Sequence, residues 1–432
     1  MSEMIKEHLD NPKANEGFKK TKIGLIPDDW DVVSLGNIGK IISGLTYSPN
    51  DINENGILVL RSSNVQNRQL EFNDNVYVNV DEDDFNPVIE NDILICVRNG
   101  SRSLIGKNTL INKESEGYAF GAFMTVYRSK LNKFLFHLFD TDIYNKEVHR
   151  NLGATINSIN GSDLKKFIMP LPPENERLKI ASILSDWDEA IENTQTLIEK
   201  LQLRKKGLMQ QLLTGKTRLA GFNEEWKEYK FGDVTTKFSK RNKELINARV
   251  YSVTNDRGFI LQTEMFEREV AGDDLTGYKI IKKNEFAYNP ARVNVGSIAL
   301  FKDEIGIISS LYVCFKTNEK LLNDYLINLL ETDELKHRIN RYGEGGVRIY
   351  LWYYLFEAIK IKLPSVVEQK AILEILDAAD QEIEHQQNYL KQLQAQKKGL
   401  MQQLLTGKIR VLNNVKLFYI LIQIFHHLLI FF

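Results

Sequence analysis

Cysteine is nearly absent from this sequence. The chain has two cysteines in 432 residues, Cys96 and Cys314, so it cannot build a disulfide framework, and such sparse use is typical of a reducing compartment. The first ten residues, MSEMIKEHLD, are polar and mixed in charge, and the apolar run of a secretory signal does not follow them. We therefore expect a cytoplasmic protein.

An excess of either charge is also missing. Lys and Arg number 56 and Asp and Glu number 57, which gives a formal net charge of −1. Because a dedicated nucleic-acid binder usually carries a basic excess, any DNA binding must depend on local basic segments or on a partner that supplies charge. The hydrophobic fraction of 43% is ordinary for a globular chain, and the length suits several domains of about 100–200 residues each.

Catalytic motifs are missing as well. The segment Leu213–Thr217 resembles the end of a phosphate-binding loop, but Gln210 occupies the position of its first glycine. Tyr288-Asn289-Pro290 resembles an element of amino-methyltransferases, yet Ala291 and Arg292 follow where a second proline and an aromatic ring belong. Neither cysteine has a Cys or His at metal spacing, and the seven histidines are scattered. We predict a chain that performs no covalent chemistry and binds no metal or cofactor itself.

A long internal repeat is present instead. Lys205–Lys216 reads KKGLMQQLLTGK, and Lys397–Lys408 repeats it 192 residues later. At that offset 25 of the 49 residues in Leu171–Leu219 are identical. Trp30–Gly36 and Trp226–Gly232 share the spacing Trp-x5-Gly. The halves otherwise differ almost completely, so two variable regions alternate with two near-constant ones, and we expect a molecule with pseudo-two-fold symmetry.

The near-constant regions predict two long helices. Pro172-Pro173 and Pro364, each followed by acidic residues, are helix start signals, and Gly215 and Gly407 are stop signals. Between these signals the apolar positions alternate steps of four and three, which is the period of a left-handed coiled coil. Each helix should run about 38 residues, or roughly 57 Å. We predict an antiparallel coiled-coil pair; the alternative is two amphipathic helices, each packed on its own domain. The predicted seam positions are Ile180, Leu184, Trp187, Ile191, Thr194, Ile198, Leu201, Lys205, Leu208 and Leu212 in the first copy, and Ile372, Leu376, Ala379, Ile383, Gln386, Leu390, Leu393, Lys397, Leu400 and Leu404 in the second.

The variable regions, Phe18–Leu171 and Phe222–Leu363, read as mixed α/β. Short β-branched runs bounded by Asn, Asp and Gly predict strands at Gly56–Leu60, Asp92–Val97 and Gly306–Phe315. A helical stretch lies near the end of each region, at Leu131–Asn151 and at Leu321–Tyr342. The fold class predicted for the whole chain is α+β.

Several loops of the variable regions are rich in side chains that suit DNA. Arg can pair bidentately with guanine and Asn with adenine, while Ser and backbone N–H groups bind phosphate. Each loop alone is weak evidence, because Asn, Gly and Ser dominate turns for backbone reasons. The candidate DNA-binding residues are Arg61, Ser62, Asn64, Arg98, Asn99, Ser101, Arg102, Lys107, Asn255, Arg257, Asn289, Arg292, Asn294, Ser297 and Arg348.

Together these features resemble the specificity subunit of type I restriction–modification enzymes. The resemblance rests on the two variable regions, the helix start Pro-Pro-x-x-Glu at Pro172, the helix end Gln-Gln-Leu-Leu-Thr-Gly-Lys and the Trp-x5-Gly starts. It covers roughly Lys20–Leu412, and the second helix start departs from it because Pro364-Ser365 lacks the doubled proline. The organisation that follows is an N-terminal arm (1–17), target-recognition domain 1 (18–171), a central conserved helix (172–216), target-recognition domain 2 (217–363), a C-terminal conserved helix (364–408) and an apolar tail (409–432).

The resemblance implies a function. Each variable domain would read one half of a bipartite site on double-stranded DNA, and the different domain sequences imply an asymmetric site. The helices would set the unread gap and dock two methyltransferase subunits, which use S-adenosylmethionine, and restriction (translocase) subunits, which use ATP and Mg²⁺. Half-sites on one face of the duplex should be centred about 10 bp apart. Four residues inserted near Leu212–Gly215 should change the gap and leave the half-sites unchanged.

Two other interpretations remain open at this stage. A self-contained modifying enzyme is disfavoured by the missing motifs, whereas a coiled-coil scaffold that joins two protein partners without reading DNA is the main alternative. The apolar part of the tail, Leu417–Phe432, has 16 residues and contains Gln423, His426 and His427, whereas a membrane span needs about 20 apolar residues. We therefore expect no membrane partner. The family usually stops soon after the Thr-Gly-Lys element, so the tail departs from its pattern.

Overall fold

The computed structural model describes residues 17–152, 157–265, 275–345 and 349–411. The chain divides into two compact units, one formed by residues 1–193 and 390–432 and the other by residues 194–389. We call them the first unit and the second unit. Nearly all of the predicted N-terminal arm, most of the apolar tail and Arg348 lie outside the described residues.

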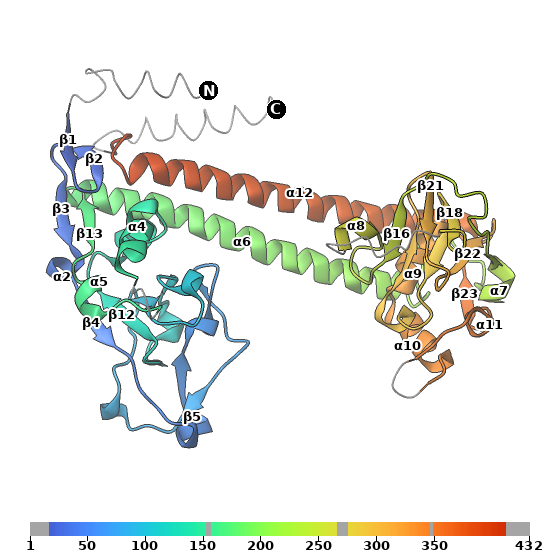
Figure 1. Cartoon of the computed structure of the whole chain (residues 1–432), viewed down its shortest axis with the longest axis horizontal. Helices are drawn as coiled ribbons and strands as arrows, with labels where there is room; N and C mark the ends of the chain where they lie inside the picture. The colour runs from blue at the N-terminus through green and yellow to red at the C-terminus, as the bar shows by residue number, and fades with distance from the viewer. Residues whose placement is uncertain (1–16, 153–156, 266–274, 346–348, 412–432) are drawn as a thin grey trace. The chain divides into compact units, whose positions relative to one another are not determined.

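Two sheets share the core of the domain in the first unit (Figure 1). One is antiparallel with strand order β10-β9-β12-β4, and the other has the order β11-β5-β8 with β5 and β11 parallel. Buried side chains from both, including Leu60, Leu94 and Val126, form one hydrophobic cluster. The strands of these sheets are β4 (Lys40–Ser43), β5 (Ile52–Leu60), β8 (Tyr77–Val78), β9 (Ile93–Cys96), β10 (Asn108–Leu110), β11 (Ala119–Phe120) and β12 (Met124–Arg128).

Short elements complete this unit around the two sheets. Strand β3 pairs with β13, the strand that leads into the first long helix, in the register Asp31 to Leu171. The remaining elements are β1 (Phe18–Thr21), β2 (Gly24–Pro27), β3 (Asp31–Ser34), α2 (Leu35–Ile38), β6 (Val65–Gln66), β7 (Gln69–Leu70), α3 (Asn132–Leu138), α4 (Asp142–Asn151), α5 (Gly161–Leu164) and β13 (Ile168–Leu171).

The domain of the second unit repeats this scaffold. Its antiparallel sheet β20-β19-β22-β15 has the same connections as β10-β9-β12-β4, and β14 pairs with β23 as β3 pairs with β13. A second sheet, β17-β16-β21-β18, shares its core with the first. The elements are β14 (Lys227–Lys230), α7 (Phe231–Val234), β15 (Thr235–Phe238), β16 (Val250–Val253), β17 (Phe259–Leu261), α8 (Gln262–Met265), β18 (Lys279–Lys282), β19 (Phe286–Tyr288), β20 (Ile298–Leu300), β21 (Ile305–Ile308), β22 (Val313–Thr317), α9 (Asn323–Leu330), α10 (Asp333–Tyr342), α11 (Tyr353–Phe356) and β23 (Lys360–Leu363).

The predicted strands and helices were found, but three stretches are divided. The run Gly306–Phe315 contains β21 and the start of β22, separated by a turn. Each helical stretch is two helices, α3 and α4 in the first domain and α9 and α10 in the second. The break falls at a Thr-Asp pair in both domains, and Thr332 Oγ1 accepts a hydrogen bond from Leu335 N at the start of α10. Threonine is a favoured N-cap residue, so it starts a new helix at this point.

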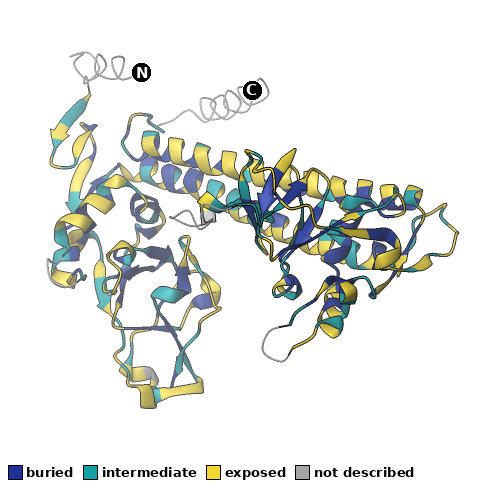
Figure 2. Cartoon of the chain, turned by 45° about the vertical axis from the view of Figure 1, so that its right-hand side comes forward, coloured by how far each residue is buried: buried dark blue, intermediate teal, exposed yellow. Residues whose placement is uncertain are grey.

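The two long helices are α6 (Glu174–Leu212) and α12 (Val366–Leu404), each 39 residues long. Every predicted seam position is buried or half-buried, and exposed residues lie between them along both helices (Figure 2). Gly215 and Gly407, three residues beyond the helix ends, have φ values of +71° and +69°, which glycine adopts without strain. The predicted lengths and stop signals are therefore confirmed.

Each unit contains one half of both helices. In the first unit Ile180 and Leu184 of α6 cluster with Met401 and Leu404 of α12, and Lys397 forms an ion pair with Asp188. In the second unit Lys205 of α6 lies 2.5 Å from Asp380 of α12. The beginning of each helix also joins the core of the domain before it, and Ile180, for example, belongs to the same hydrophobic cluster as Leu135 of α3. Within each unit, the long helices therefore contact each other as well as the domain.

Residues of the repeat meet in what we call the first clasp (Trp30, Glu176, Gly407, Arg410) and the second clasp (Trp226, Glu368, Gly215, Arg218). In the first clasp Trp30 Nε1 donates to Glu176 Oε2 at 3.0 Å, and Arg410 donates from Nε and Nη2 to both oxygens of that carboxylate at 2.8 Å. A Cβ on Gly407 would lie 3.2 Å from the Trp30 ring and closer still to Pro27, which excludes larger residues. The second clasp repeats these contacts, with Arg218 bound to Glu368 through both oxygens. The repeated residues thus tie the start of one long helix to the segment that follows the other.

Candidate nucleic-acid interface

In the first unit, the loop between β9 and β10 carries five of the predicted DNA-binding residues. Arg98, Ser101 and Arg102 are exposed, and Asn99 and Lys107 are half-buried. Asn99 Oδ1 accepts a hydrogen bond from Ser101 N at 2.9 Å, which fixes the first turn of the loop. The Arg98 guanidinium lies 5.7 Å from the ring centre of Phe123, an aromatic residue that is 56% exposed. The loop therefore presents cationic groups beside an apolar ring.

A second predicted loop, Arg61–Asn64, lies against the first. Lys107 Nζ donates to Ser62 O at 3.2 Å and joins them. Arg61 is 3.0 Å from Asp74 Oδ1. Asn64 is fully buried, and its amide donates to Glu71 O at 3.0 Å while its Oδ1 accepts from Arg61 N. The Asn64 side chain therefore points into the domain. Its hydrogen bonds stabilise the turn, and it does not face outward toward a ligand.

In the second unit, six of the predicted residues come together in two adjacent loops. The loop 289–297, between β19 and β20, occupies the place of the β9–β10 loop, and the neighbouring loop 254–258 joins β16 to β17. Ser297 Oγ donates to Val253 O at 2.9 Å and is almost fully buried, so it joins the two loops and does not face outward. The other five residues are exposed or half-buried: Asn255, Arg257, Asn289, Arg292 and Asn294.

A third segment beside these loops was missed in the sequence. In the first unit residues 157–160 lie against the β9–β10 loop, where Ile159 N donates to Val97 O at 2.9 Å and Asn157 Nδ2 donates to Gly100 O at 3.0 Å. In the second unit Leu351 N donates to Pro290 O at 2.9 Å, which places Tyr350 and Trp352 beside loop 289–297. These contacts lie at equivalent places. In the second unit the aromatic run Tyr350–Phe356 could have marked the segment, whereas residues 157–160 carry no such run.

This third segment differs between the two units in chemistry. At the 192-residue offset Tyr350 corresponds to Ser158, and Trp352 corresponds to Asn160. The rings of Tyr350 and Trp352 are stacked with centroids 5.9 Å apart, and Trp352 is 46% exposed. One scaffold position therefore carries small polar side chains in one domain and a pair of aromatic rings in the other.

The chemistry of the described residues gives no sign of a reactive centre. Burial raises the pKa of the Cys96 thiol and raises the pKa of Cys314 to about 12, so neither is a thiolate near neutral pH. Across the described ranges, no group of three or more His, Cys, Asp or Glu side chains is arranged to hold a metal ion. Within the same ranges, no helix is both long and apolar enough to cross a bilayer.

One buried titratable group links the domain to the helices in the first unit. His137 of α3 is 2% exposed, and its Nδ1 lies 3.5 Å from Asp188 Oδ2 of α6. Burial is the main cause that lowers the pKa of His137 to about 3, with Lys397 and Arg68 lowering it further. When the two domains are aligned on their Thr-Asp pairs, which are 191 residues apart, the position of His137 is taken by Asn328 of α9.

Replacing His137 by Asn is therefore expected to remove a source of acid sensitivity. Because the pKa of a free imidazole is about 6.5, the unfolded chain binds a proton between that value and about 3 while the folded chain does not. The stability from this residue is complete above pH 6.5 and falls by up to about 1.4 kcal/mol per pH unit below it. Urea unfolding at a series of pH values should show a shallower decline for H137N, and an unchanged slope would contradict the assignment.

Comparison with known proteins gives the family. The sequence matches the type I restriction modification DNA specificity domain twice, over residues 27–203 and 223–394. It is 30% identical over 424 residues to a Methanocaldococcus jannaschii protein provisionally named type I restriction enzyme MjaX specificity subunit, covering 92% of this chain and 97% of that protein. It is 26% identical over 216 residues to the EcoKI specificity subunit of Escherichia coli strain K12, covering 48% of this chain and 46% of that protein.

Solved structures show the same fold at low identity. A chain from a study of complex assembly and conformational transition of the type I R-M system has a TM-score of 0.56 and 16% identity, covering 89% of this chain and 99% of that one. The S subunit of M. genitalium has a TM-score of 0.50 and 17% identity, and the match covers 87% of this chain and 96% of that subunit. The two domain matches and the 30% identical relative show that the chain belongs to the type I restriction–modification DNA specificity family, as a non-catalytic specificity subunit with two target recognition domains.

Proposed function

We propose that this specificity subunit reads an asymmetric, bipartite site on double-stranded DNA, with one domain on each half-site. The observation that carries the proposal is the repeated reading surface. Both domains present the loop after the central strand of the antiparallel sheet, supported by a second loop and by the third segment, on a common scaffold. The scaffold is the same while the outward side chains differ, which is what two different half-sites require.

The exposed side chains supply the contacts that such reading needs. Arg98 and Arg102 in the first domain, and Arg257 and Arg292 in the second, are exposed cations that suit guanine edges or phosphates. Asn255 is an exposed amide that suits adenine. Asn64 and Ser297 serve by positioning the loops, because both are buried. Arg348 stays a candidate outside the described residues.

We propose further that α6 and α12 form an antiparallel coiled coil that sets the unread gap. The reciprocal pairs Lys397–Asp188 and Lys205–Asp380 support this, because each helix contributes one lysine and one aspartate to a common register. The helices would also dock two methyltransferase subunits and the restriction subunits, and those partners would carry S-adenosylmethionine, ATP and Mg²⁺. Such a complex would methylate adenine and cleave DNA in the cytoplasm. Partner cations would supplement the phosphate contacts of a chain whose net charge is −1.

Sequencing the methylated bases of a host genome with and without the gene tests the proposal. The expected result is one bipartite motif with two unlike half-sites that is methylated only when the gene is present. If the lost motif were a continuous palindrome, the assignment of one domain to each half-site would be wrong. If no motif changed while the chain still joined two proteins, the scaffold function would be the better description.

Replacing Trp352 by Ala is expected to weaken recognition of one half-site without unfolding the chain. In a duplex an apolar side chain can read the thymine methyl group, and losing recognition of one base pair costs about 1–3 kcal/mol, so DNA affinity should fall by roughly five-fold to a hundred-fold. W352F should retain most of the affinity, and Y389A, which removes an exposed ring from α12, should retain all of it. Affinities for duplexes altered in one half-site at a time provide the measurement. An equal loss on all duplexes, including unrelated DNA, would show that Trp352 does not read sequence.

A further inference from the structure

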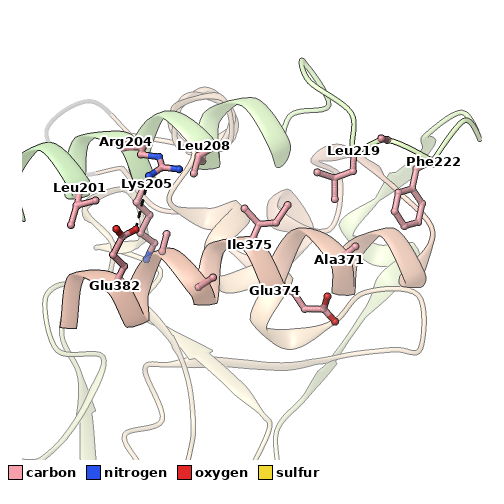
Figure 3. A pocket seen from close by; sticks show the side chains of 13 residues that line it. Leu201, Arg204, Lys205, Leu208, Leu219, Phe222, Ala371, Glu374, Ile375 and Glu382 are labelled. Carbon is pink, nitrogen blue, oxygen red and sulfur yellow. Dashed lines mark ion pairs between the residues drawn. The ribbon is translucent and has the colours of Figure 1, made fainter. Parts of the chain in front are cut away.

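A cavity of about 640 Å³ lies between the long helices in the second unit. Figure 3 shows α6 and α12 on its two sides, with Leu219 and Phe222 at one end and Arg204, Lys205 and Glu382 at the other. Its walls are mainly apolar. We call it the α6–α12 cavity, and its lining residues are Leu201, Arg204, Lys205, Leu208, Leu219, Ala220, Phe222, Ala371, Glu374, Ile375, Ala378, Ala379 and Glu382.

The internal repeat shows what is missing from this cavity. At the 192-residue offset three of its apolar wall residues have apolar counterparts in the first unit, where Leu201 corresponds to Leu393, Leu208 to Leu400 and Ile375 to Ile183. Three others have polar or charged counterparts, since Ala371, Ala378 and Phe222 correspond to Lys179, Asp186 and Asn414. Ala379, however, corresponds to Trp187, a half-buried residue that packs against the core cluster of the first unit. The second unit is therefore hollow at the position where the first unit places an indole ring.

The rim of the cavity differs from its counterpart as well. Arg204, Glu374 and Glu382 correspond to the uncharged Gln396, Ser182 and Ala190, whereas the charged Lys179 and Asp186 of the first unit are replaced by alanines in the second, so the charges lie at different positions in the two units. Arg204 and Glu382 are 4.0 Å apart and largely exposed, whereas Glu374 has no partner among the residues that the structure describes. An apolar pocket with a charged rim is the usual setting of a binding hot spot, where an aromatic anchor is buried and polar residues surround it.

We propose that the α6–α12 cavity receives one large aromatic side chain from a protein partner, with a basic residue of that partner facing Glu374. Trp187 fills the equivalent place in the first unit, so the two halves of the helix repeat are unequal binding surfaces. This inference rests on the proposed docking of methyltransferase subunits and adds that one of the two copies is anchored by a ring inserted here, while the other meets a closed surface.

The cavity-filling variant A379W tests the inference. It restores at Ala379 the residue that the repeat carries at Trp187, so the fold should tolerate it, and its melting temperature reports whether it does. The full chain is titrated with a purified methyltransferase subunit of a type I system from the same host, by calorimetry and native mass spectrometry. We expect A379W to weaken one of the two binding steps at least ten-fold and E374K to weaken the same step. A395W, which adds the same ring to an exposed part of α12, should change neither step.

The outcomes separate this inference from the function on which it depends. If the unaltered chain binds no methyltransferase subunit, the proposed function fails. If the unaltered chain binds two copies and A379W binds them equally well, only the cavity assignment fails. A379L, with a smaller side chain, should show an intermediate loss even if A379W lowers the melting temperature, and full affinity in A379L would also overturn the proposal. Self-association of the free chain that A379W abolishes would identify a second copy as the occupant.

Discussion

Inserting four residues into each long helix, after Asn193 in α6 and after Tyr389 in α12, is expected to lengthen the gap in the methylated site by one to two base pairs. Four helical residues advance about 6 Å and turn about 40° beyond one full turn. One base pair advances about 3.4 Å and turns about 35°. The half-site sequences should stay unchanged, because no residue of either reading surface is altered. Sequencing of methylated bases in a strain that carries the variant provides the measurement.

The structure changes where such an insertion belongs. The position chosen from the sequence, Leu212–Gly215, lies beyond the Lys205–Asp380 pair and within the packed core of the second unit, where Leu212 and Leu213 are buried. Four residues added there would displace the second clasp instead of lengthening the segment between the two Lys–Asp pairs. Insertion into one helix alone is the control, since it shifts one lysine away from its aspartate and should reduce stability. A double insertion that altered a half-site would contradict the ruler function.

Replacing Arg410 by Ala is expected to destabilise the first unit by about 3 kcal/mol, since removing one partner of a buried ion pair leaves an uncompensated charge. The remaining carboxylate of Glu176 is only 2% exposed. It would keep the hydrogen bonds from Trp30 Nε1 and Val411 N but would lose its counter-charge. The hydrogen bonding of Arg410 to the Glu176 carboxylate is also the main cause that raises the pKa of Arg410, in keeping with a strong pairing. Urea unfolding followed by tryptophan fluorescence measures the loss.

Two further variants make this result specific to the clasp. R218A removes the equivalent arginine from Glu368, which is also 2% exposed, and should destabilise the second unit by a similar amount. The double variant E176Q/R410A removes the buried charge together with its partner and should recover most of the loss. If R410A cost less than about 1 kcal/mol, the first clasp would be no more than an ordinary surface ion pair.

The lining residues of the α6–α12 cavity differ from their counterparts in the first unit. This difference bears on how such a chain can hold two copies of one partner. A repeat with identical helices would bind both copies alike, whereas under the proposed docking the difference between Trp187 and Ala379 would make the two binding steps differ in strength. Complexes with one or with two methyltransferase subunits would then occur at different partner concentrations. The reading surfaces are unaffected by this difference, since none of their residues lines the cavity.

The sequence by itself determined the repeat, the helices and the division into two variable regions. The spacing of apolar residues and the helix stop signals are local properties of the sequence. The seam from Ile180 to Leu212 could therefore be predicted directly, and Gly215 and Gly407 marked the helix ends. The repeated tryptophan, glutamate and arginine were visible as identities. Their purpose was not visible, because each clasp joins residues as far apart as Trp30 and Arg410.

Tertiary structure alone decided which candidate side chains face outward. Arg98 and Asn64 look equally suited to DNA in the sequence, but burial assigns Asn64 to the turn and leaves Arg98 exposed. The third segment was missed because an aromatic run such as Tyr350–Phe356 is equally typical of a buried core. Trp352 gains its place beside loop 289–297 only through the backbone hydrogen bond from Leu351 N to Pro290 O, across 61 residues of chain. Periodicity and capping act between neighbours in sequence, whereas a binding surface is assembled from loops that only the folded sheets bring together.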